Sequence, residues 1–511
     1  MFLNFMKINN FSKISSNIFS SRVTGFFRDV LFANFLGANI LSDAFLFAFR
    51  LPNLFRRILA EGVMNSVFIP LYIKQTKESQ SLANDFTSAI FLIFLIITSI
   101  MTVLVYFFSG QITSLLAPGF LENEDQFNFA IQLIPIIFPF LIFVTLSAVI
   151  SSVLNIRGKF FLPSFLSVIL NLFMIGTLLI FKSDSHFPLA WSILIAGIIQ
   201  LSLLLINANI LKILFQFGLK KILLLSSVLK TFFKRFLFSV LGSGIVQLNI
   251  FVSMLFASLV GEGAISHIYY ADRIIDLPFA LIAVAMTFTL LPYLSKNILD
   301  EEKNANAFNQ TIIFCFIFAI PSSFALFFIS EDIVKVLFGR GEFLNKDIII
   351  TSNLLLIYSF SLPGYMISRI CNQVFYSYER VDLPIKASIP TFFLNLILCF
   401  SMYRSMGVYG LAIAGAMSVW LNVFIQIFFL RFYFSNFYKK IKLINILKIT
   451  KILASSLIMI FTILFLQNIL NINIYIDLFI LILIGVSVFF TMLRLLKLEE
   501  YRLIYKSALF N

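Results

Sequence analysis

Charge-poor apolar stretches about 20 residues long recur along the whole chain and constrain its fold more than any other feature. A helix needs about 20 mostly apolar residues to cross a bilayer. Runs such as 88–108 and 478–490 are uninterrupted apolar blocks, without the in-out alternation of membrane β-strands. The chain has 511 residues, 60% hydrophobic and 12% charged, with a mean hydropathy of +0.99, which excludes a water-soluble enzyme. We predict an all-α polytopic membrane protein.

Polar breaks between these stretches predict fourteen transmembrane helices. The expected spans lie near residues 10–35, 40–72, 87–109, 128–154, 160–181, 188–211, 236–260, 265–294, 308–330, 348–375, 384–403, 408–431, 452–468 and 476–493. An even number of spans places both termini on one side of the membrane. That number also assigns every polar loop to one of the two faces.

Basic residues outside the spans indicate the orientation. The chain carries 38 Lys and Arg against 24 Asp and Glu. Of the Lys and Arg in loops and tails, 25 fall on the side of the termini and 5 on the opposite side. Cytoplasmic loops of membrane proteins carry such an excess. We therefore expect both termini in the cytoplasm, and we attribute the net charge of +14 to membrane orientation and not to nucleic acid.

An internal repeat appears when the chain is shifted over itself by about 222 residues. Phe68-Ile-Pro70 then falls on Leu290-Leu-Pro292, and Leu162-Pro163 falls on Leu383-Pro384. Two such halves around a central cavity are a common transporter plan. The predicted organisation is an N-terminal lobe at 1–211, a cytoplasmic linker at 212–235, a C-terminal lobe at 236–431, and a helix pair with a tail at 432–511.

Charged residues within the second expected span form a polar face. On an ideal helix Arg50, Arg57 and Glu61 fall within about 40° of Asp43. Asn53 lies about 80° from Asp43, while Arg56 points about 140° away. We expect Pro52 to interrupt this helix, leaving backbone carbonyls that a cavity would hydrate.

Arginines outnumber acids in the first two spans. Five arginines (Arg22, Arg28, Arg50, Arg56 and Arg57) stand against Asp29, Asp43 and Glu61. Charged side chains at membrane depth cost about 2.5–3.5 kcal/mol each to insert, so they face protein or water. Ion pairs among Asp43, Arg50, Arg57 and Glu61 that hold two helices together are one explanation. The surplus favours a second, a cavity for an anion, and the planar guanidinium suits a lipid diphosphate.

The second half carries a related motif, Tyr269-Tyr-Ala-Asp-Arg-Ile-Ile-Asp-Leu-Pro278. Asp272 and Asp276 share one helix face. They suit binding of Mg²⁺-diphosphate, neutralisation of Arg273, or binding of a coupled cation. Membrane prenyltransferases have an Asn four residues before the first Asp, where this chain has Ile268, so pairing with Arg273 is favoured. We find no catalytic or metal-binding constellation and predict no cofactor.

Three segments carry a family resemblance. They are SRVTGFFRDVLFANFLGA at 21–38, SDAFLFAFRLPNLFRRILAEG at 42–62 and YYADRIIDLP at 269–278. These segments resemble the MurJ/MviN lipid II flippases of the multidrug, oligosaccharidyl-lipid and polysaccharide exporter superfamily. The resemblance implies a bacterial inner-membrane protein with two six-helix lobes, alternating access, and a groove for the polyprenyl tail formed by the last helix pair with the second lobe.

The resemblance also implies site residues. The family's cavity arginines fall on Arg22, Arg28, Arg56, Arg57 and Arg273. Positions where the family commonly carries charge fall on Asp43, Asp272, Asp276 and Lys386. Arg50 and Asn53 complete the predicted substrate-binding set. The resemblance places Arg56 in the cavity, in conflict with ideal helix geometry, and a kink at Pro52 would reconcile the two. Thr24 stands where the family usually has an apolar residue.

We therefore predict a transporter, not an enzyme, that moves lipid II from the cytoplasmic to the periplasmic leaflet. Its expected partners are lipid II and membrane lipids, with a coupled ion or the membrane potential left open as the energy source. The alternatives are a flippase for another polyprenyl-linked glycan or a cation-coupled drug exporter, which would need an acidic cavity. A membrane enzyme acting on diphosphate lipids is less favoured, because the sequence lacks catalytic groups.

Overall fold

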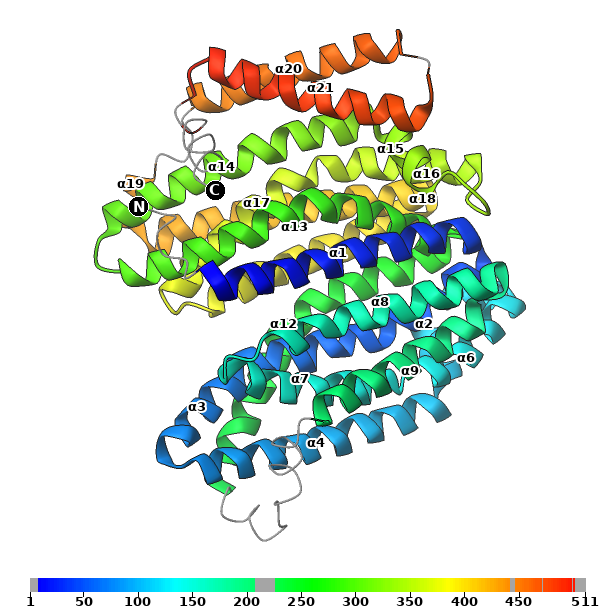
Figure 1. Ribbon diagram of the computed structural model, residues 1–511, viewed down its shortest axis with the longest axis vertical. Coiled ribbons are helices and arrows are strands. Elements are labelled where there is room, and N and C mark those ends of the chain that lie inside the picture. Colours follow the sequence, from blue (N-terminus) through cyan, green and yellow to red (C-terminus); the bar gives the residue numbers. More distant parts are fainter. Residues whose placement is uncertain (1–7, 207–225, 442–445, 471, 499, 501–511) are drawn as a thin grey trace. The chain divides into compact units, whose positions relative to one another are not determined.

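The computed structural model describes residues 8–206, 226–441, 446–470, 472–498 and 500. These residues form helices and connecting turns, with no strand among them. By their contacts they divide into an N-terminal unit that ends at Ser266 and a C-terminal unit that begins at His267. We describe each unit by itself (Figure 1).

The N-terminal unit contains the first nine α-helices, α12, two π-helical segments and short 3₁₀ turns. Their bounds are α1 (Ile8–Leu36), α2 (Ile40–Arg56), η2 (Arg57–Gly62), η3 (Met64–Phe68), α3 (Ile69–Glu78), α4 (Gln80–Phe107), α5 (Ser109–Leu116), η4 (Pro118–Glu122), α6 (Glu124–Ile137), α7 (Phe140–Ile156), α8 (Phe161–Phe181), η5 (Lys182–Asp184), α9 (His186–Leu205) and α12 (Ser226–Val260).

The C-terminal unit contains the remaining helices, of which α13 begins three residues before the division. Their bounds are α13 (Ala264–Lys296), α14 (Glu301–Phe328), α15 (Ser330–Phe338), α16 (Asn345–Ser359), α17 (Ser361–Ser377), α18 (Asp382–Tyr433), α19 (Ser435–Lys440), α20 (Ile446–Gln467) and α21 (Ile474–Leu495). The all-α membrane fold predicted from the sequence is confirmed.

The expected spans fall on helices, apart from 207–211, which lie outside the described residues. The expected span 40–72 covers α2, η2, η3 and the start of α3, and two expected spans fall within α18. Within the described parts of the chain, eight helices are long and apolar enough to cross a membrane, and the bent pair α16–α17 is a ninth if it counts as one span. α18 has 52 residues and is broken at Gly407, whose φ is 55°. A straight helix of that length would be about 78 Å long, so the break accommodates the two spans expected there.

The internal repeat is visible in the element boundaries. A shift of about 222 residues carries the bounds of α4 and α5 onto 302–329 and 331–338, where α14 and α15 lie. The same shift carries α6 and α7 onto 346–359 and 362–378, where α16 and α17 lie. All four pairs agree within about one residue, which is within the usual uncertainty of helix ends. The two halves therefore share one order of helices.

The core of the N-terminal unit joins the π-helical segments to α12. Val63 and Phe68 pack in one buried cluster with Phe86, Phe94 and Phe232. The rings of Phe86 and Phe232 meet edge to face with centroids 6.2 Å apart, an arrangement that adds to the apolar burial. Because Phe232 lies on α12, this helix belongs by its contacts to the N-terminal unit. The contact boundary thus follows Ser266 and does not fall in the expected linker at 212–235, most of which lies outside the described residues.

A close backbone approach fixes α12 at its other end. The Gly119 N–H in η4 donates to Ser258 Oγ at 3.2 Å. A Cβ on Gly119 would lie 1.9 Å from the Ser258 carbonyl oxygen. Only glycine allows this approach, so η4 packs directly against the backbone near the end of α12.

The last two helices form a hairpin that packs on α14 (Figure 1). Ile317 on α14 is buried against Ile452 and Ile463 on α20 and Leu481 on α21. A Cβ on Gly485 would lie 2.7 Å from Ile463 Cδ1, so this glycine lets α20 and α21 approach closely. The expected C-terminal helix pair is therefore present, and it is attached to the C-terminal unit.

Candidate substrate-binding site

Arg28 lies on α1 where this helix packs along α8. Only 8% of the residue is exposed. Its Nε and Nη2 atoms donate to Asp29 Oδ1 at 2.9 and 2.6 Å, and its Nη1 donates to Asn171 Oδ1 at 3.0 Å. A buried guanidinium is stable only when its charge and its N–H groups are satisfied. Arg28 is therefore satisfied by its neighbour Asp29 on α1 and by the neutral side chain of Asn171 on α8.

Asn171 is the residue of this site that sequence reasoning missed. It is 6% exposed and lies on α8, far from Arg28 in sequence. Its Nδ2 donates to the Ser21 carbonyl and to Thr24 Oγ1, both at 3.2 Å. An Asn within an otherwise apolar run of α8 is the signal that was available, because polar side chains inside membrane helices usually have a specific partner.

A tight turn connects α1 to α2. Gly37 has a φ of 61°, in the left-handed region that commonly ends a helix. Asn39 Oδ1 then accepts from the Ser42 N–H at 3.0 Å and caps α2. Asp43, the predicted acidic residue of α2, is 1% exposed. Its Oδ1 accepts from the main-chain N–H and the hydroxyl of Ser266 at 2.8 and 2.6 Å.

The predicted polar face of α2 changes from buried to exposed along the helix. Asp43 is buried, Arg50 and Asn53 are half-buried, and Arg57 is exposed. Arg56 Nε donates to Asn53 Oδ1 at 3.2 Å, which draws its side chain toward the polar face. This contact brings the Arg56 side chain closer to the polar face than ideal helix geometry predicts.

The expected interruption at Pro52 is wrong. α2 continues through Pro52 to Arg56, because a proline keeps a helical φ and costs one backbone hydrogen bond. Asn53 Nδ2 adds a bond to the Phe49 carbonyl at 2.8 Å. Regular α geometry is lost only from Arg57 onward, where the helix becomes π-helical.

Two π-helical segments, η2 and η3, follow α2 directly. The Val63 N–H bonds to the Ile58 carbonyl, and the Ile69 N–H bonds to the Met64 carbonyl. Both are the i→i+5 bonds that define π-helix, a form found mostly as single turns at functional sites. These segments begin at Arg57, so this predicted site residue lies where α2 passes into the wider turn.

Arg273 lies on α13 in the C-terminal unit. Its guanidinium carbon is 4.6 Å from the centre of the Tyr269 ring, a cation–π contact. Its Nη1 lies 3.9 Å from Asp276 Oδ2, with the two side chains 33% and 49% exposed. The arrangement agrees with the favoured interpretation of the motif, in which Asp276 pairs with Arg273. Asp272 is half-buried on the same helix.

Arg22 and Lys386 lie at exposed positions. Arg22 is on α1, six residues before Arg28. Lys386 is in the second turn of α18, where its Nζ lies 2.8 Å from Asp382 Oδ2. Arg380 also pairs with Asp382 at 2.8 Å. A role for Lys386 in binding substrate stays a prediction.

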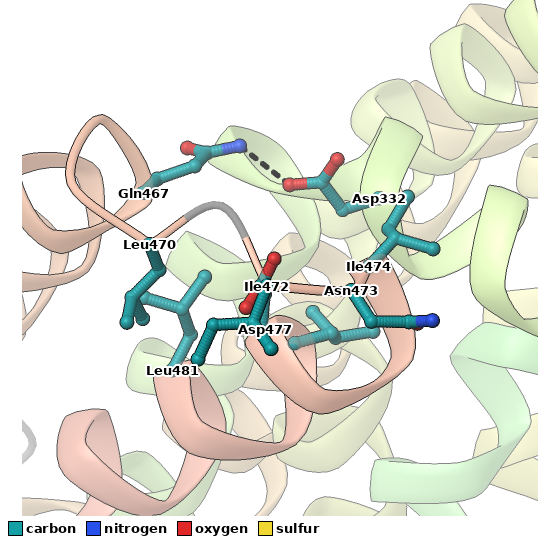
Figure 2. A pocket seen from close by; sticks show the side chains of 9 residues that line it. Asp332, Gln467, Leu470, Ile472, Asn473, Ile474, Asp477 and Leu481 are labelled. Atoms are coloured by element: carbon teal, nitrogen blue, oxygen red, sulfur yellow. Dashed lines mark hydrogen bonds between the residues drawn. The ribbon is translucent and has the colours of Figure 1, made fainter.

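An acidic pocket lies in the C-terminal unit at the turn between α20 and α21 (Figure 2). Asp332 on α15 accepts a hydrogen bond from Gln467, and Asp477 also lines the pocket. Partial burial and the neighbouring Glu331 raise the pKa of Asp332. None of the lining residues is basic, so this pocket is not suited to a diphosphate.

Two pairs of the predicted set come together, Arg56 with Asn53 and Arg273 with Asp276, while the partners of Arg28 lie outside that set. Arg28 gathers with Asn171 and Asp29, and Arg56 gathers with Asn53. Arg273 gathers with Tyr269 and Asp276. These groups offer guanidinium N–H donors, which bind phosphate oxygens.

The chain is similar to lipid II flippases in sequence and in structure. The profile described as "Lipid II flippase MurJ" matches residues 32–487. A probable lipid II flippase MurJ of Aquifex aeolicus (strain VF5) is 36% identical over 415 residues, which cover 79% of each chain. A solved structure described as "Lipid II flippase MurJ, inward closed conformation" is 26% identical, covers 98% of this chain and 99% of its own, and has a TM-score of 0.79.

A more distant likeness concerns the fold alone. The inward-facing structure of a multidrug resistance MATE family transporter of the MOP superfamily is 15% identical and has a TM-score of 0.62. It covers 82% of this chain and 96% of its own. The family profile spans most of the chain, in agreement with the three motifs that carried the resemblance. This chain belongs to the lipid II flippase MurJ family.

Proposed function

We propose that this protein moves lipid II from the cytoplasmic to the periplasmic leaflet of a bacterial inner membrane by alternating access. The observation that carries the proposal is the set of arginines in α1, α2 and α13 within a chain of the lipid II flippase family. Transport of this kind needs no bond to be made or broken in the lipid. The protein is therefore a transporter and not an enzyme.

The arginines are the proposed ligands of the lipid diphosphate. Arg22 and Arg57 are exposed, so an anion can reach both side chains. Arg273 is partly exposed, and its contact with the Tyr269 face leaves the guanidinium plane able to change partners. Arg28 is buried, and it contributes to binding by exchanging a hydrogen bond to Asp29 for one to a phosphate oxygen while Asn171 keeps its guanidinium in place. Each such charge-assisted bond is about twice as strong as a neutral one.

The lipid tail stays in the bilayer beside the α20–α21 hairpin in this proposal. Phe461, Phe465 and Phe479 are 76%, 65% and 64% exposed on that hairpin. Large apolar side chains on a membrane helix are suited to acyl or polyprenyl chains, which are as apolar as they are. The head group moves between leaflets while the tail remains in hydrocarbon.

The orientation with both termini in the cytoplasm rests on the bias of 25 basic residues to 5. An inside-negative potential favours outward movement of an anion by about 2.3 kcal/mol per charge per 100 mV. We propose that this potential biases transport of the anionic head group. A coupled ion is the alternative, and imposing each gradient separately on proteoliposomes distinguishes the two.

Native mass spectrometry of the purified protein tests the substrate. Lipid II is titrated in competition with undecaprenyl diphosphates that carry other glycans and with undecaprenyl monophosphate. We expect lipid II to bind most tightly and the monophosphate to bind least tightly, because it offers fewer phosphate oxygens. Tighter binding of a lipid with another glycan would identify that lipid as the substrate, as in the alternative of a flippase for another polyprenyl-linked glycan. Equal binding of the monophosphate would contradict recognition of the diphosphate.

A further inference from the structure

The hydrogen bonds around Asn171 form a chain in which each group donates to the next, from Arg28 through Asn171 and Thr24 to the main chain of α1. Thr24 Oγ1 donates to the main chain one turn back, at 2.8 Å from the Ser20 carbonyl. The same oxygen accepts from Asn171 Nδ2. The other end of the amide, Oδ1, accepts from Arg28. A chain of bonds therefore links the backbone of α1, through a side chain of α8, to a guanidinium of α1.

This arrangement fixes the orientation of the Asn171 amide. Its NH₂ group faces two acceptors, the Ser21 carbonyl and Thr24 Oγ1. If the amide were flipped, its oxygen would face the Ser21 carbonyl and its NH₂ group would face the Arg28 donors. Both contacts would be repulsive, since neither pair would contain a donor and an acceptor. The carbonyl of Asn171 is therefore directed at Arg28.

The packing around Asn171 restricts it further. A Cβ on Gly25 would lie 3.3 Å from Asn171 Nδ2, so the amide lies close against the backbone of α1. Asn171 is also a neutral acceptor, which holds the guanidinium without neutralising its charge. Asp29 already supplies one negative charge to Arg28, and a second carboxylate would leave an excess of negative charge beside a site for an anion.

We propose that Asn171 is a positioning residue for lipid II recognition. It holds the guanidinium of Arg28 in one orientation against α1, and Thr24 holds Asn171 in turn. The inference rests on the proposed role of Arg28 in binding the diphosphate. It adds α8, which carries no charged residue of the predicted site, to the part of the protein that determines lipid II affinity.

A double-mutant cycle measured as lipid II affinity by native mass spectrometry tests this inference. Asn171→Leu removes the acceptor at similar volume. We expect its dissociation constant for lipid II to rise about tenfold, equivalent to about 1.4 kcal/mol, the scale of one hydrogen bond to a charged group. In an Arg28→Lys background the same substitution should change affinity less than about twofold, because the group that Asn171 positions is already gone.

Two further variants separate positioning from packing. Gln200→Leu is the matched control. Gln200 lies on α9, is 3% exposed and donates at 2.7 Å to the carbonyl of Leu166, which lies on α8 as Asn171 does. It should leave lipid II affinity unchanged. Thr24→Val keeps the shape of the side chain and removes one partner of Asn171. We expect it to weaken binding about threefold, less than Asn171→Leu because the Ser21 carbonyl remains.

The outcomes distinguish this inference from the proposed function. If Arg28→Lys alone leaves lipid II affinity unchanged, the proposed role of Arg28 is wrong. If Arg28→Lys weakens binding but Asn171→Leu does not, the positioning role of Asn171 is wrong. Equal effects of Asn171→Leu in both backgrounds would also overturn it, because Asn171 would then act independently of Arg28. An equal effect of Gln200→Leu would overturn it as well, because the loss would then come from disturbed packing against α8.

Discussion

Arg28 and Arg273 are two membrane-helix arginines held in opposite ways. Arg28 is 8% exposed, and its two guanidinium edges meet a carboxylate and an amide at 2.6–3.0 Å. The Arg273 side chain is 33% exposed, and its carboxylate partner lies 3.9 Å away. Arg28 is thus preorganised, while Arg273 keeps freedom to adjust.

The difference arises from where the partners lie. Asn171 reaches Arg28 from a neighbouring helix, α8, that packs along α1. Tyr269 and Asp276 lie on the same helix as Arg273, about one turn away on either side. A partner on a second helix fixes a side chain relative to the fold, whereas partners on its own helix move with it. A rigid and an adaptable arginine together suit a substrate whose position changes during transport.

The largest difference between the two arginines is expected on substitution by lysine. Arg28→Lys loses at least two hydrogen bonds of about 1.5–3 kcal/mol each, so the rate of lipid II flipping in proteoliposomes should fall about 100-fold or more. Arg273→Lys keeps a cation over the Tyr269 face and should lose about threefold. Similar losses for both variants would remove the distinction between a rigid and an adaptable arginine.

A smaller difference is expected in stability when each arginine loses its acid. Asp29→Asn leaves a buried charge poorly compensated and should destabilise the purified protein by about 3 kcal/mol. Asp276→Asn acts on a half-exposed pair and should cost at most about 1 kcal/mol. Thermal unfolding in detergent measures both. Greater destabilisation by Asp276→Asn would show that Arg273 is the more constrained residue.

The smallest effect concerns the Tyr269 ring. Tyr269→Leu removes the aromatic face beneath Arg273, worth about 0.5–1 kcal/mol at a partly exposed site, so lipid II affinity should fall about two- to fivefold. Tyr269→Phe keeps the face and serves as the control. If the phenylalanine variant binds lipid II as weakly as the leucine variant, the hydroxyl and not the ring supports Arg273.

The helical class and the span positions could be predicted because both depend on local composition. About 20 apolar residues form a membrane helix wherever they occur, and the expected ranges fall on helices with short breaks as far as the structure describes them. The repeat was equally accessible, because duplicated segments keep their spacing. The motif residues of α1, α2 and α13 were found because charge in an apolar span is conspicuous.

Other features depend on tertiary packing and were not predictable. Asn171 meets Arg28 only because α1 packs along α8, and nothing in one sequence names that neighbour. The π-helical segments that begin at Arg57 have no amino-acid composition that distinguishes them from α-helix. The boundary after Ser266 follows from the packing of Phe232 into the N-terminal core. At Pro52 the sequence rule was applied too strictly, because a helix tolerates the loss of one backbone bond.

The central claim is that arginines on membrane helices bind the lipid II head group and that the protein carries it across the membrane. The most direct measurement is the amount of lipid II exposed on the periplasmic leaflet of cells depleted of their own flippase. This protein should restore exposure and growth. The Arg28→Ala variant, inserted in the membrane at equal level, should restore neither. Normal exposure and growth with Arg28→Ala would contradict the account.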